Sequence, residues 1–185
     1  MPHGVTESAM SVNSKGAVVQ PQIRPERADD QPAIRAITQA AFAHNAHSQG
    51  TEGAIIDALR AAGALCLSLV AVADGEVVGH IAFSPVTIDG GQQGWCGLGP
   101  LAVRPDHHRQ GIGGALIRAG LARLQQTGAG GCVLVGDPGY YRRFGFENDP
   151  DLRYEGVPAE YFVRLAFKQP LPAGNVRFHA GFAAR

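Results

Sequence analysis

The stretch from Trp95 to Val135 constrains the fold more than any other part of the sequence, because three patterns follow one another in it. Residues 95–103 form a β-rich run, and after a glycine-rich turn apolar residues recur at helical spacing along 112–126. The short run 132–135 is wholly apolar, which is typical of a strand buried on both faces of a parallel sheet. A strand, a helix and a second strand in this order predict a crossover, and hence an α/β fold with a parallel strand pair.

The patterns on either side of this unit predict antiparallel strands. Residues 65–73 and 76–88 are β-rich and are separated by Asp74-Gly75, a dipeptide that suits the tight turn of a hairpin. Residues 161–167 and 175–180 alternate between apolar and polar side chains, and they predict two late strands. Together with the parallel pair, these strands predict a mixed sheet.

Two amphipathic helices are expected before the hairpin. Asp29 or Asp30 caps the first helix, which ends near Phe42, and Thr51 caps the second helix, which stops at Gly63. Helices on the faces of a mixed sheet complete the expected architecture.

The length and composition fit one globular domain with a short leading segment. The chain has 185 residues, of which 45% are hydrophobic, and this suffices for a core. Residues 1–18 show neither helical nor strand periodicity, and we expect them to form a mobile extension. Residues 19–185 are expected to form the domain, with a first strand at 19–24.

The charge and the cysteine usage exclude several classes of protein. Lys and Arg number 16 and Asp and Glu number 16, so a polyanion such as nucleic acid is not an expected partner. No apolar run approaches the roughly 18 residues of a membrane span, and the polar opening lacks the centre of a signal peptide, so we expect a cytoplasmic protein without a membrane partner. Cys66, Cys96 and Cys132 are scattered among apolar residues, which favours buried thiols over disulfides or a metal site.

The turn between residues 103 and 112 carries the clearest functional signal. Its glycines lie where a strand gives way to a helix, so unpaired main-chain N–H groups, aided by the helix dipole, can converge on a phosphate. A phosphate loop would need Lys-Ser or Lys-Thr after the last glycine, and Gly114-Ala115 supplies neither. A dinucleotide fingerprint would need glycine at Leu116. The turn therefore predicts an anion site that fits neither of these nucleotide-binding motifs well.

Pro100 interrupts the strand that precedes this turn. Because proline cannot donate to a strand ladder, it indicates an edge, a strand start or a bulge, and we favour a bulge at Gly99-Pro100. Such a bulge would splay the strand from its parallel neighbour at 132–135. It would leave a cleft with free N–H groups near Leu101 and Val103, open to an extended, amide-bearing ligand.

At this point the sequence resembles the GNAT superfamily of acyl-CoA-dependent N-acetyltransferases. The family signature is Gln or Arg, two residues, Gly, one residue, then Gly or Ala, and residues 108–113 read His-Arg-Gln-Gly-Ile-Gly. Residues 136–146 are similar to the family segment in which Tyr, three residues and Gly-Phe recur, with Tyr141 at the position of the family acid. Residues 157–162 and 174–182 resemble the YhbS-like branch of bacterial acetyltransferases.

The resemblance implies the GNAT fold, in which a mixed central sheet carries helices on both faces and contains a splayed pair of parallel strands. It also implies acetyl-CoA as the cosubstrate, with no metal. The pantetheine arm would lie along Leu101, Ala102 and Val103, with the Leu101 N–H holding the thioester carbonyl and Val103 pairing with a pantetheine amide. The pyrophosphate would be held by the N–H groups of Arg109, Gln110, Gly111, Ile112, Gly113 and Gly114.

Two side chains are candidates for proton transfer. An alkylamine with a pKa near 10.4 is mostly protonated at pH 7, so its attack needs a proton acceptor. Glu52, on the apolar face of the second helix, is the preferred acceptor; alternatively, it only stabilises the helix N-terminus. Tyr141 is the candidate acid for the departing thiolate, or it only packs beside Phe144 and Phe146.

Four other residues keep two interpretations each. Asp137 either orients the pantetheine end or caps the next turn through its side chain. Arg142 and Arg143 either meet the adenosine phosphate of CoA or are exposed charges on a short helix. His80 either faces the acceptor or belongs to the core.

The resemblance implies an N-acetyltransferase that moves an acetyl group from acetyl-CoA to a primary amine by direct attack in a ternary complex. Two alternatives remain: a non-catalytic acyl-CoA-binding regulatory protein with the same cleft, and a nucleotide-phosphate module that uses only the glycine turn. The acceptor is left open between a small amine, an antibiotic, a peptide N-terminus and a lysine side chain, and so is the acyl chain length. The oligomeric state is open as well, a homodimer included.

Overall fold

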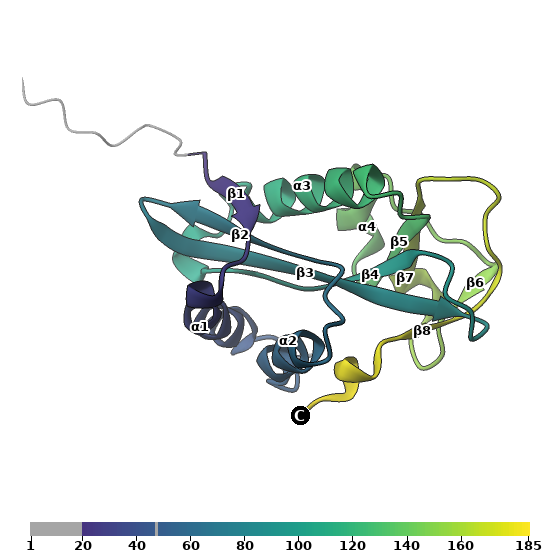
Figure 1. Cartoon of the computed structure of the whole chain (residues 1–185), viewed down its shortest axis with the longest axis horizontal. Helices are drawn as coiled ribbons and strands as arrows, with labels where there is room; N and C mark the ends of the chain where they lie inside the picture. Colours follow the sequence, from purple (N-terminus) through teal and green to yellow (C-terminus); the bar gives the residue numbers. More distant parts are fainter. Residues whose placement is uncertain (1–19, 47) are drawn as a thin grey trace, which may run out of the picture.

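The structure of the chain is a computed structural model that describes residues 20–46 and 48–185 (Figure 1). The mobile extension expected at 1–18 lies outside the described residues. Within the described part, one mixed sheet forms the centre of the molecule, and helices lie against both of its faces (Figure 1).

The sheet confirms the expected mixture of antiparallel and parallel pairs. Its strands run in the order β1-β2-β3-β4-β5-β7, while β8 pairs with both β3 and β6. The β4–β5 and β6–β8 pairs are parallel, and all other pairs of named strands in the described chain are antiparallel. The strands are β1 (Gln22–Pro25), β2 (Leu67–Ala73), β3 (Glu76–Ile88), β4 (Trp95–Val103), β5 (Gly131–Val135), β6 (Leu152–Arg153), β7 (Phe162–Ala166) and β8 (Gly174–Phe178).

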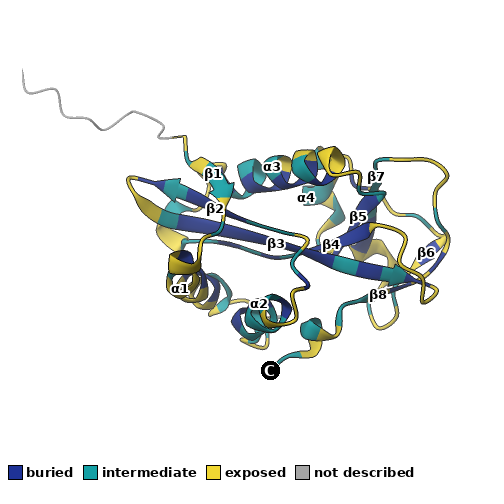
Figure 2. Ribbon diagram, in the orientation of Figure 1, coloured by how far each residue is buried: buried dark blue, intermediate teal, exposed yellow. Residues whose placement is uncertain are grey.

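The helices divide between the two faces of this sheet. Helices α1 (Gln31–Phe42) and α2 (Glu52–Ala61) cover one face, and α3 (Ile112–Gln126) and α4 (Pro138–Tyr141) lie on the other (Figure 1). Ile112, Leu116 and Ile117 of α3 pack into the largest core cluster, together with Phe83 of β3. Burial is continuous along the central strands, and the exposed residues gather in the connections (Figure 2).

The boundaries of several elements differ from the expected ones. Strand β1 occupies 22–25 rather than 19–24, β2 begins at Leu67 rather than residue 65, and the two-residue β6 was not expected at all. The hairpin strand 76–88, the strand 95–103 and the helix 112–126 have the expected bounds. The long periodic segments are therefore predicted well. The ends of the strands are predicted less well, because they depend on how far the neighbouring strand continues the hydrogen-bonded pairing.

Both expected capping residues stand directly before their helices, but neither side chain makes the expected capping hydrogen bond. Asp30 precedes α1, but its carboxylate binds the Arg24 guanidinium at 2.6 and 2.9 Å and accepts the Arg27 N–H at 2.7 Å. Thr51 precedes α2 without a capping bond from its side chain. Gly63 ends α2 as expected, with φ of 63° and its N–H donating to the Arg60 carbonyl.

The cysteines follow the expectation only in part. Cys96 and Cys132 are buried side by side on β4 and β5, but Cys66 is exposed in the turn before β2. Cys66 lies where the chain leaves α2 for the sheet, so the apolar residues around it in the sequence do not enclose it.

Candidate active site

Strands β4 and β5 separate after a short parallel contact. Their last paired residues are Gly97 and Val133. Against β3, the register moves from Phe83 opposite Leu98 to Ile81 opposite Leu101, so β4 holds one residue more than β3 over this stretch. This extra residue is the bulge expected at Gly99-Pro100, and it bends β4 away from β5.

The main chain of β4 beyond the bulge has donors that face the gap. Arg104 donates its N–H to the Val78 carbonyl across the β3 ladder. Because donors alternate in direction along an antiparallel strand, the N–H groups of Ala102 and Arg104 point to β3, and those of Leu101 and Val103 point to the gap left by β5. The Val103 carbonyl is engaged by the His108 ring, whose Nε2 lies 2.9 Å away.

The glycine turn presents main-chain N–H groups at the start of α3. Gly111 occupies the N-cap position with φ of 79°, and Arg109 has φ of 62°, a left-handed value that costs a non-glycine residue about 1–2 kcal/mol. Alternation of left- and right-handed residues turns successive N–H groups toward one point, and the helix N-terminus adds its own unpaired donors. The backbone geometry of the turn therefore suits an anion, as the sequence predicts.

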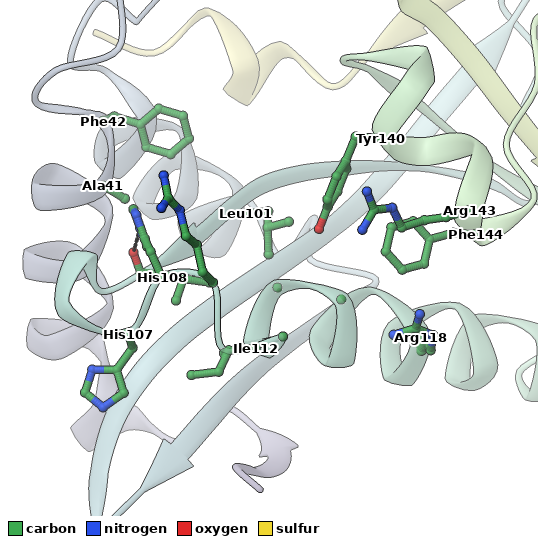
Figure 3. A pocket seen from close by; sticks show the side chains of 15 residues that line it. Ala41, Phe42, Leu101, His107, His108, Ile112, Arg118, Tyr140, Arg143 and Phe144 are labelled. Atoms are coloured by element: carbon green, nitrogen blue, oxygen red, sulfur yellow. Dashed lines mark hydrogen bonds between the residues drawn. The ribbon is translucent and has the colours of Figure 1, made fainter. Parts of the chain in front are cut away.

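A cavity of about 720 Å³ extends from Leu101 and Val103, beyond the bulge of β4, to this turn (Figure 3). The residues that line it come from β4, the turn, α3, the end of α1 and the segment around α4, and the described ones include no Asp or Glu. They are Ala41, Phe42, Leu101, Val103, His107, His108, Arg109, Gly111, Ile112, Gly113, Gly114, Arg118, Tyr140, Arg143 and Phe144.

Most of the residues expected to bind the cofactor line this cavity, but Ala102, Gln110, Asp137 and Tyr141 do not. Ala102 is 2% exposed and, by strand alternation, faces the opposite side of the sheet from Leu101 and Val103. The Gln110 side chain lies outside the cavity and folds back toward the Asp106 carbonyl at 3.4 Å. The Ala102 side chain therefore faces away from the cleft, because a strand shows only every second residue to one face.

Tyr141 lies at the end of β5 and is mostly enclosed by other side chains. Its ring packs edge-on against Tyr140 at 5.0 Å and against Phe146 at 5.9 Å between ring centroids. A Cβ at Gly136 would come within 2.5 Å of the Tyr141 ring, so that glycine is what lets the ring approach the strand. Burial raises the pKa of Tyr141 to about 12.

Tyr140, which the sequence did not single out, is the tyrosine that lines the cavity (Figure 3). A Cβ at Gly113 would lie 3.7 Å from its hydroxyl oxygen, so this hydroxyl stands over the first turn of α3. The resemblance directed attention to Tyr141 through the spacing to Gly145-Phe146. The spacing alone does not say which of two neighbouring rings faces the cavity.

Glu52 and Asp137 lie outside this cavity. Glu52 is the first residue of α2 and is partly exposed, and it is not among the residues that line the cavity. Asp137 is the N-cap of α4, where its Oδ1 accepts the Gly139 N–H at 2.8 Å. The capping interpretation of Asp137 is therefore confirmed, and no described contact tests its role toward pantetheine.

Two further cavities lie on the opposite side of the molecule, around the loop that leads into β7. They measure about 680 and 400 Å³, and Tyr154 and Glu155 line both. The Phe178 ring, in the smaller cavity, closes against Gly97: a Cβ there would meet the ring at 2.4 Å. Phe162, which lines the larger of these cavities, belongs to a core cluster with Val133 of β5.

Two negative findings apply to the described residues. In residues 20–46 and 48–185, no three or more His, Cys, Asp and Glu side chains are grouped so as to hold a metal ion. Over the same residues, no helix has the length and apolar character required to cross a membrane.

Comparison with known proteins shows to which family this chain belongs. Residues 64–148 match the model of the acetyltransferase (GNAT) domain. Over 167 residues the chain is 36% identical to the YhbS N-acetyltransferase of Escherichia coli strain K12, an alignment that covers 86% of this chain and 97% of that protein. The chain belongs to the GNAT acetyltransferase family.

Two solved structures of GNAT proteins share the fold at substantial identity. A GNAT acetyltransferase from Brucella melitensis, determined in complex with acetyl-CoA, is 54% identical with a TM-score of 0.80, covering 89% of this chain and 99% of that one. The Escherichia coli YhbS structure, determined in complex with CoA, is 34% identical with a TM-score of 0.83, covering 89% and 93%. The mixed sheet with a parting parallel pair is thus the GNAT fold, as expected.

Proposed function

We propose that this protein transfers the acetyl group of acetyl-CoA to a primary amine by direct attack within a ternary complex. The observation that carries the proposal is the cavity that runs from Leu101 and Val103, where β4 is no longer paired with β5, to the glycine turn of α3. One end of the cavity offers strand N–H groups to a chain of amides, and the other offers helix N–H groups to a pyrophosphate. The relatives crystallised with acetyl-CoA and CoA support this choice of ligand.

The first turn of α3 fits the ligand because its backbone can be approached closely. A Cβ at Gly113 would lie between the Tyr140 hydroxyl and the Leu101 and Val103 side chains, at 3.7 to 4.0 Å, on the wall of the cavity. The pyrophosphate would rest on the N–H groups of residues 109–114. The pantetheine arm would pair with the Val103 N–H, and the Leu101 N–H would stabilise negative charge on the thioester oxygen during attack.

The transfer forms a bond from the amine nitrogen to the acetyl carbon and breaks the carbon–sulfur bond. The protonated amine loses one proton before it attacks and a second as the amide forms. The departing thiolate takes up one proton, so that one proton is released to solvent overall. Glu52 is the proposed proton acceptor, directly or through water, because deprotonating an amine of pKa near 10.4 at pH 7 costs roughly 4 to 5 kcal/mol. Tyr141 is the proposed donor to the departing thiolate. Its raised pKa, about 12, supports this role, since the hydroxyl keeps its proton at neutral pH.

The proposed binding of CoA is tested by placing a large side chain at Gly113, on the wall of the cavity. Gly113→Leu would project a side chain into the cavity and should weaken CoA binding at least about tenfold, measured by isothermal titration calorimetry. Gly113→Ala is the matched control, because its Cβ meets only ordinary contacts within the protein, and it should weaken CoA binding much less than Gly113→Leu does. Equal affinity of the Leu variant and the parent would refute the pyrophosphate assignment.

The proposed acetyl transfer is tested by measuring the release of the free CoA thiol. Acetyl-CoA and a panel of primary amines should yield free CoA thiol and an acetylated product detectable by mass spectrometry. A protein that binds acetyl-CoA tightly but releases thiol with no amine in the panel or in a cell extract would instead be a non-catalytic acyl-CoA-binding regulator.

A further inference from the structure

The two cavities beside the loop that leads into β7 have no part in the function proposed above. They measure about 680 and 400 Å³, and Tyr154, Glu155 and Asn175 line both of them. The Tyr154 ring contacts one ring from each cavity, with centroids 5.6 Å from Phe162 of the larger and 5.1 Å from Phe178 of the smaller. Because Tyr154 is also partly exposed, a ligand in either cavity can contact its ring.

The Phe178 ring places the smaller cavity beside the point where β4 and β5 part. A Cβ at Gly97 would meet this ring at 2.4 Å, and Gly97 is the last residue of β4 that pairs with β5. The neighbours of Gly97 along β4, Cys96 and Leu98, belong to the core cluster that includes Leu116 of α3. Because side chains alternate along a strand, Phe178 lies on the face of the sheet opposite α3.

A second substrate must reach the parting strands from a side that CoA leaves free. Gly113, Gly114 and Arg118 of α3 line the first cavity, so CoA bound there lies on the α3 side of the sheet. Direct attack requires the amine nitrogen to come within about 3–3.5 Å of the thioester carbon while CoA is bound. The two cavities share no described lining residue with the first, so they stay available to an acceptor in the ternary complex.

Several polar side chains of the larger cavity are already engaged within the protein. The Asn148 amide donates to three main-chain carbonyls at 2.9 to 3.0 Å, and the Asp149 carboxylate forms an ion pair with Arg164 at 2.8 Å. Arg153 Nε lies 3.4 Å from the amide oxygen of Asn175. Much of the remaining wall is apolar or aromatic, from Pro150, Leu152, Tyr154, Val157, Ala159 and Phe162. Such a wall favours an apolar ligand body over a charged one.

The exposed charges along the two cavities balance. Glu155 and Glu160 contribute exposed carboxylates, and Arg153 and Arg177 contribute exposed guanidinium groups. The first cavity is different, because three arginines and no Asp or Glu are among its described lining residues. An acceptor in the two cavities therefore needs no second charge beside its amine, and neither a polycation nor a polyanion is favoured.

We propose that the two cavities form the acceptor site and that the acceptor is a primary amine with an aromatic body and no second charge, whose ring packs against Tyr154. This inference rests on the proposed function and names a substrate class for it. Aromatic rings attract one another at about 4.5–7 Å between centroids, and Tyr154 already packs in this range against Phe162 and Phe178. Tyr154 is the specificity-determining residue, and the two phenylalanines position its ring.

The test compares phenethylamine, butylamine and diaminobutane as acceptors at saturating acetyl-CoA, with release of the CoA thiol as the readout. For the parent protein, kcat/KM for phenethylamine should exceed that for either aliphatic amine at least about tenfold. In Tyr154→Ala this preference should fall to within about threefold, through a higher KM for phenethylamine and with the Kd for CoA unchanged. Tyr154→Phe keeps the ring and should keep the preference. Tyr161→Ala is the matched control, because Tyr161 is an exposed tyrosine that lines neither cavity, and it should also keep the preference.

Three outcomes would overturn the substrate class and leave acetyl transfer intact. The first is turnover of the aliphatic amines, or of acceptors from a cell extract, that equals or exceeds turnover of phenethylamine. The second is a preference for phenethylamine that survives Tyr154→Ala, which would place its recognition elsewhere. The third is an equal loss with all three amines in Tyr154→Ala, which would give Tyr154 a structural role only. Thiol release with no amine and no extract would refute the proposed function, and this inference with it. Thermal unfolding of each variant verifies that it is folded.

Discussion

Tyr140 and Tyr141 are neighbours in the chain but have different surroundings. Tyr140 lines the cavity above the first turn of α3, while Tyr141 is packed at the end of β5, where the two parallel strands have parted. The Tyr141 ring lies against Gly136, the residue that directly follows β5. From these positions we propose that Tyr140 contributes to ligand binding, while proton transfer stays the proposed role of Tyr141.

Replacing Tyr141 by Phe should lower turnover about 10² to 10⁴-fold with little change in the Kd for CoA. Because burial raises the pKa of Tyr141 to about 12, the phenol stays protonated between pH 6 and 9, and the loss should be the same throughout this range. Steady-state kinetics at several pH values measures both effects.

Tyr140→Phe is the control for this prediction. It removes a hydroxyl from the cavity wall, so it should raise the Kd for CoA more than it lowers turnover. The roles would have to be exchanged if Tyr140→Phe reduced turnover and Tyr141→Phe left it unchanged.

Among single residues, the sequence predicts the main-chain features of the site better than the positions of its side chains. The anion site at 109–114 and the bulge at Gly99-Pro100 follow from glycine and proline, whose backbone restrictions act wherever they stand. The sequence did not indicate Arg118 and Tyr140, because their side chains line the cavity only through the orientation of their helices. That direction is set by the packing of α3 and α4 against the sheet, which no local pattern encodes.

Among the elements, the contact between α3 and β3 is the tightest constraint on the position of the anion site. A Cβ at Gly120 would lie 2.4 Å from two atoms of the Phe83 ring, which is fully buried. Gly120 therefore lets the middle of α3 rest close on the sheet, and the turn of residues 109–114 leads into the N-terminal end of the same helix. Helical periodicity predicts α3, but it gives no reason for glycine at position 120. That reason is the Phe83 ring, which the structure places against this residue.

Gly120→Ala should lower the free energy of unfolding by roughly 1 to 2 kcal/mol. Overpacking a core costs about 1–3 kcal/mol, and alanine recovers at most about 1 kcal/mol through helix propensity. Gly113→Ala on the same helix is the matched control, because its Cβ meets nothing closer than 3.7 Å, and it should be neutral or slightly stabilising. Urea unfolding compares the two, and equal stability of both variants would contradict the proposed overlap with Phe83.

Over the whole molecule, a buried polar cluster ties the first strands of the sheet to α2. The Glu26 carboxylate binds the Arg60 guanidinium at 2.8 and 3.1 Å and accepts a hydrogen bond from the Ser68 hydroxyl. His80 Nε2 lies 2.8 Å from the same hydroxyl and 3.4 Å from the carboxylate. His80 is therefore a core residue of β3, and the cluster spans the end of β1, β2, β3 and α2, segments that no sequence pattern connects.

His80 makes the stability of the whole fold sensitive to mild acid. Its side chain is fully buried, and its Nδ1 has no hydrogen-bond partner in the described chain, so a second ring proton would find no acceptor there. Burial lowers the pKa of His80 below its usual 6.5, although Glu26 opposes the shift. The unfolded chain therefore binds a proton below about pH 6.5 that the folded chain refuses, and the free energy of unfolding must fall as the pH drops.

Urea unfolding between pH 7.5 and 5.5 should show this loss, with a contribution from His80 of up to about 1.4 kcal/mol per pH unit below pH 6.5. Glu26 adds nothing in this range: the same cluster lowers its pKa from an already acidic value despite burial, so its effect is confined to pH below about 4.5. His80→Gln should flatten the pH dependence even if it lowers stability at pH 7.5. His44→Gln, at an exposed histidine, should leave the slope unchanged, and a slope that survives His80→Gln would assign the acid sensitivity to other groups.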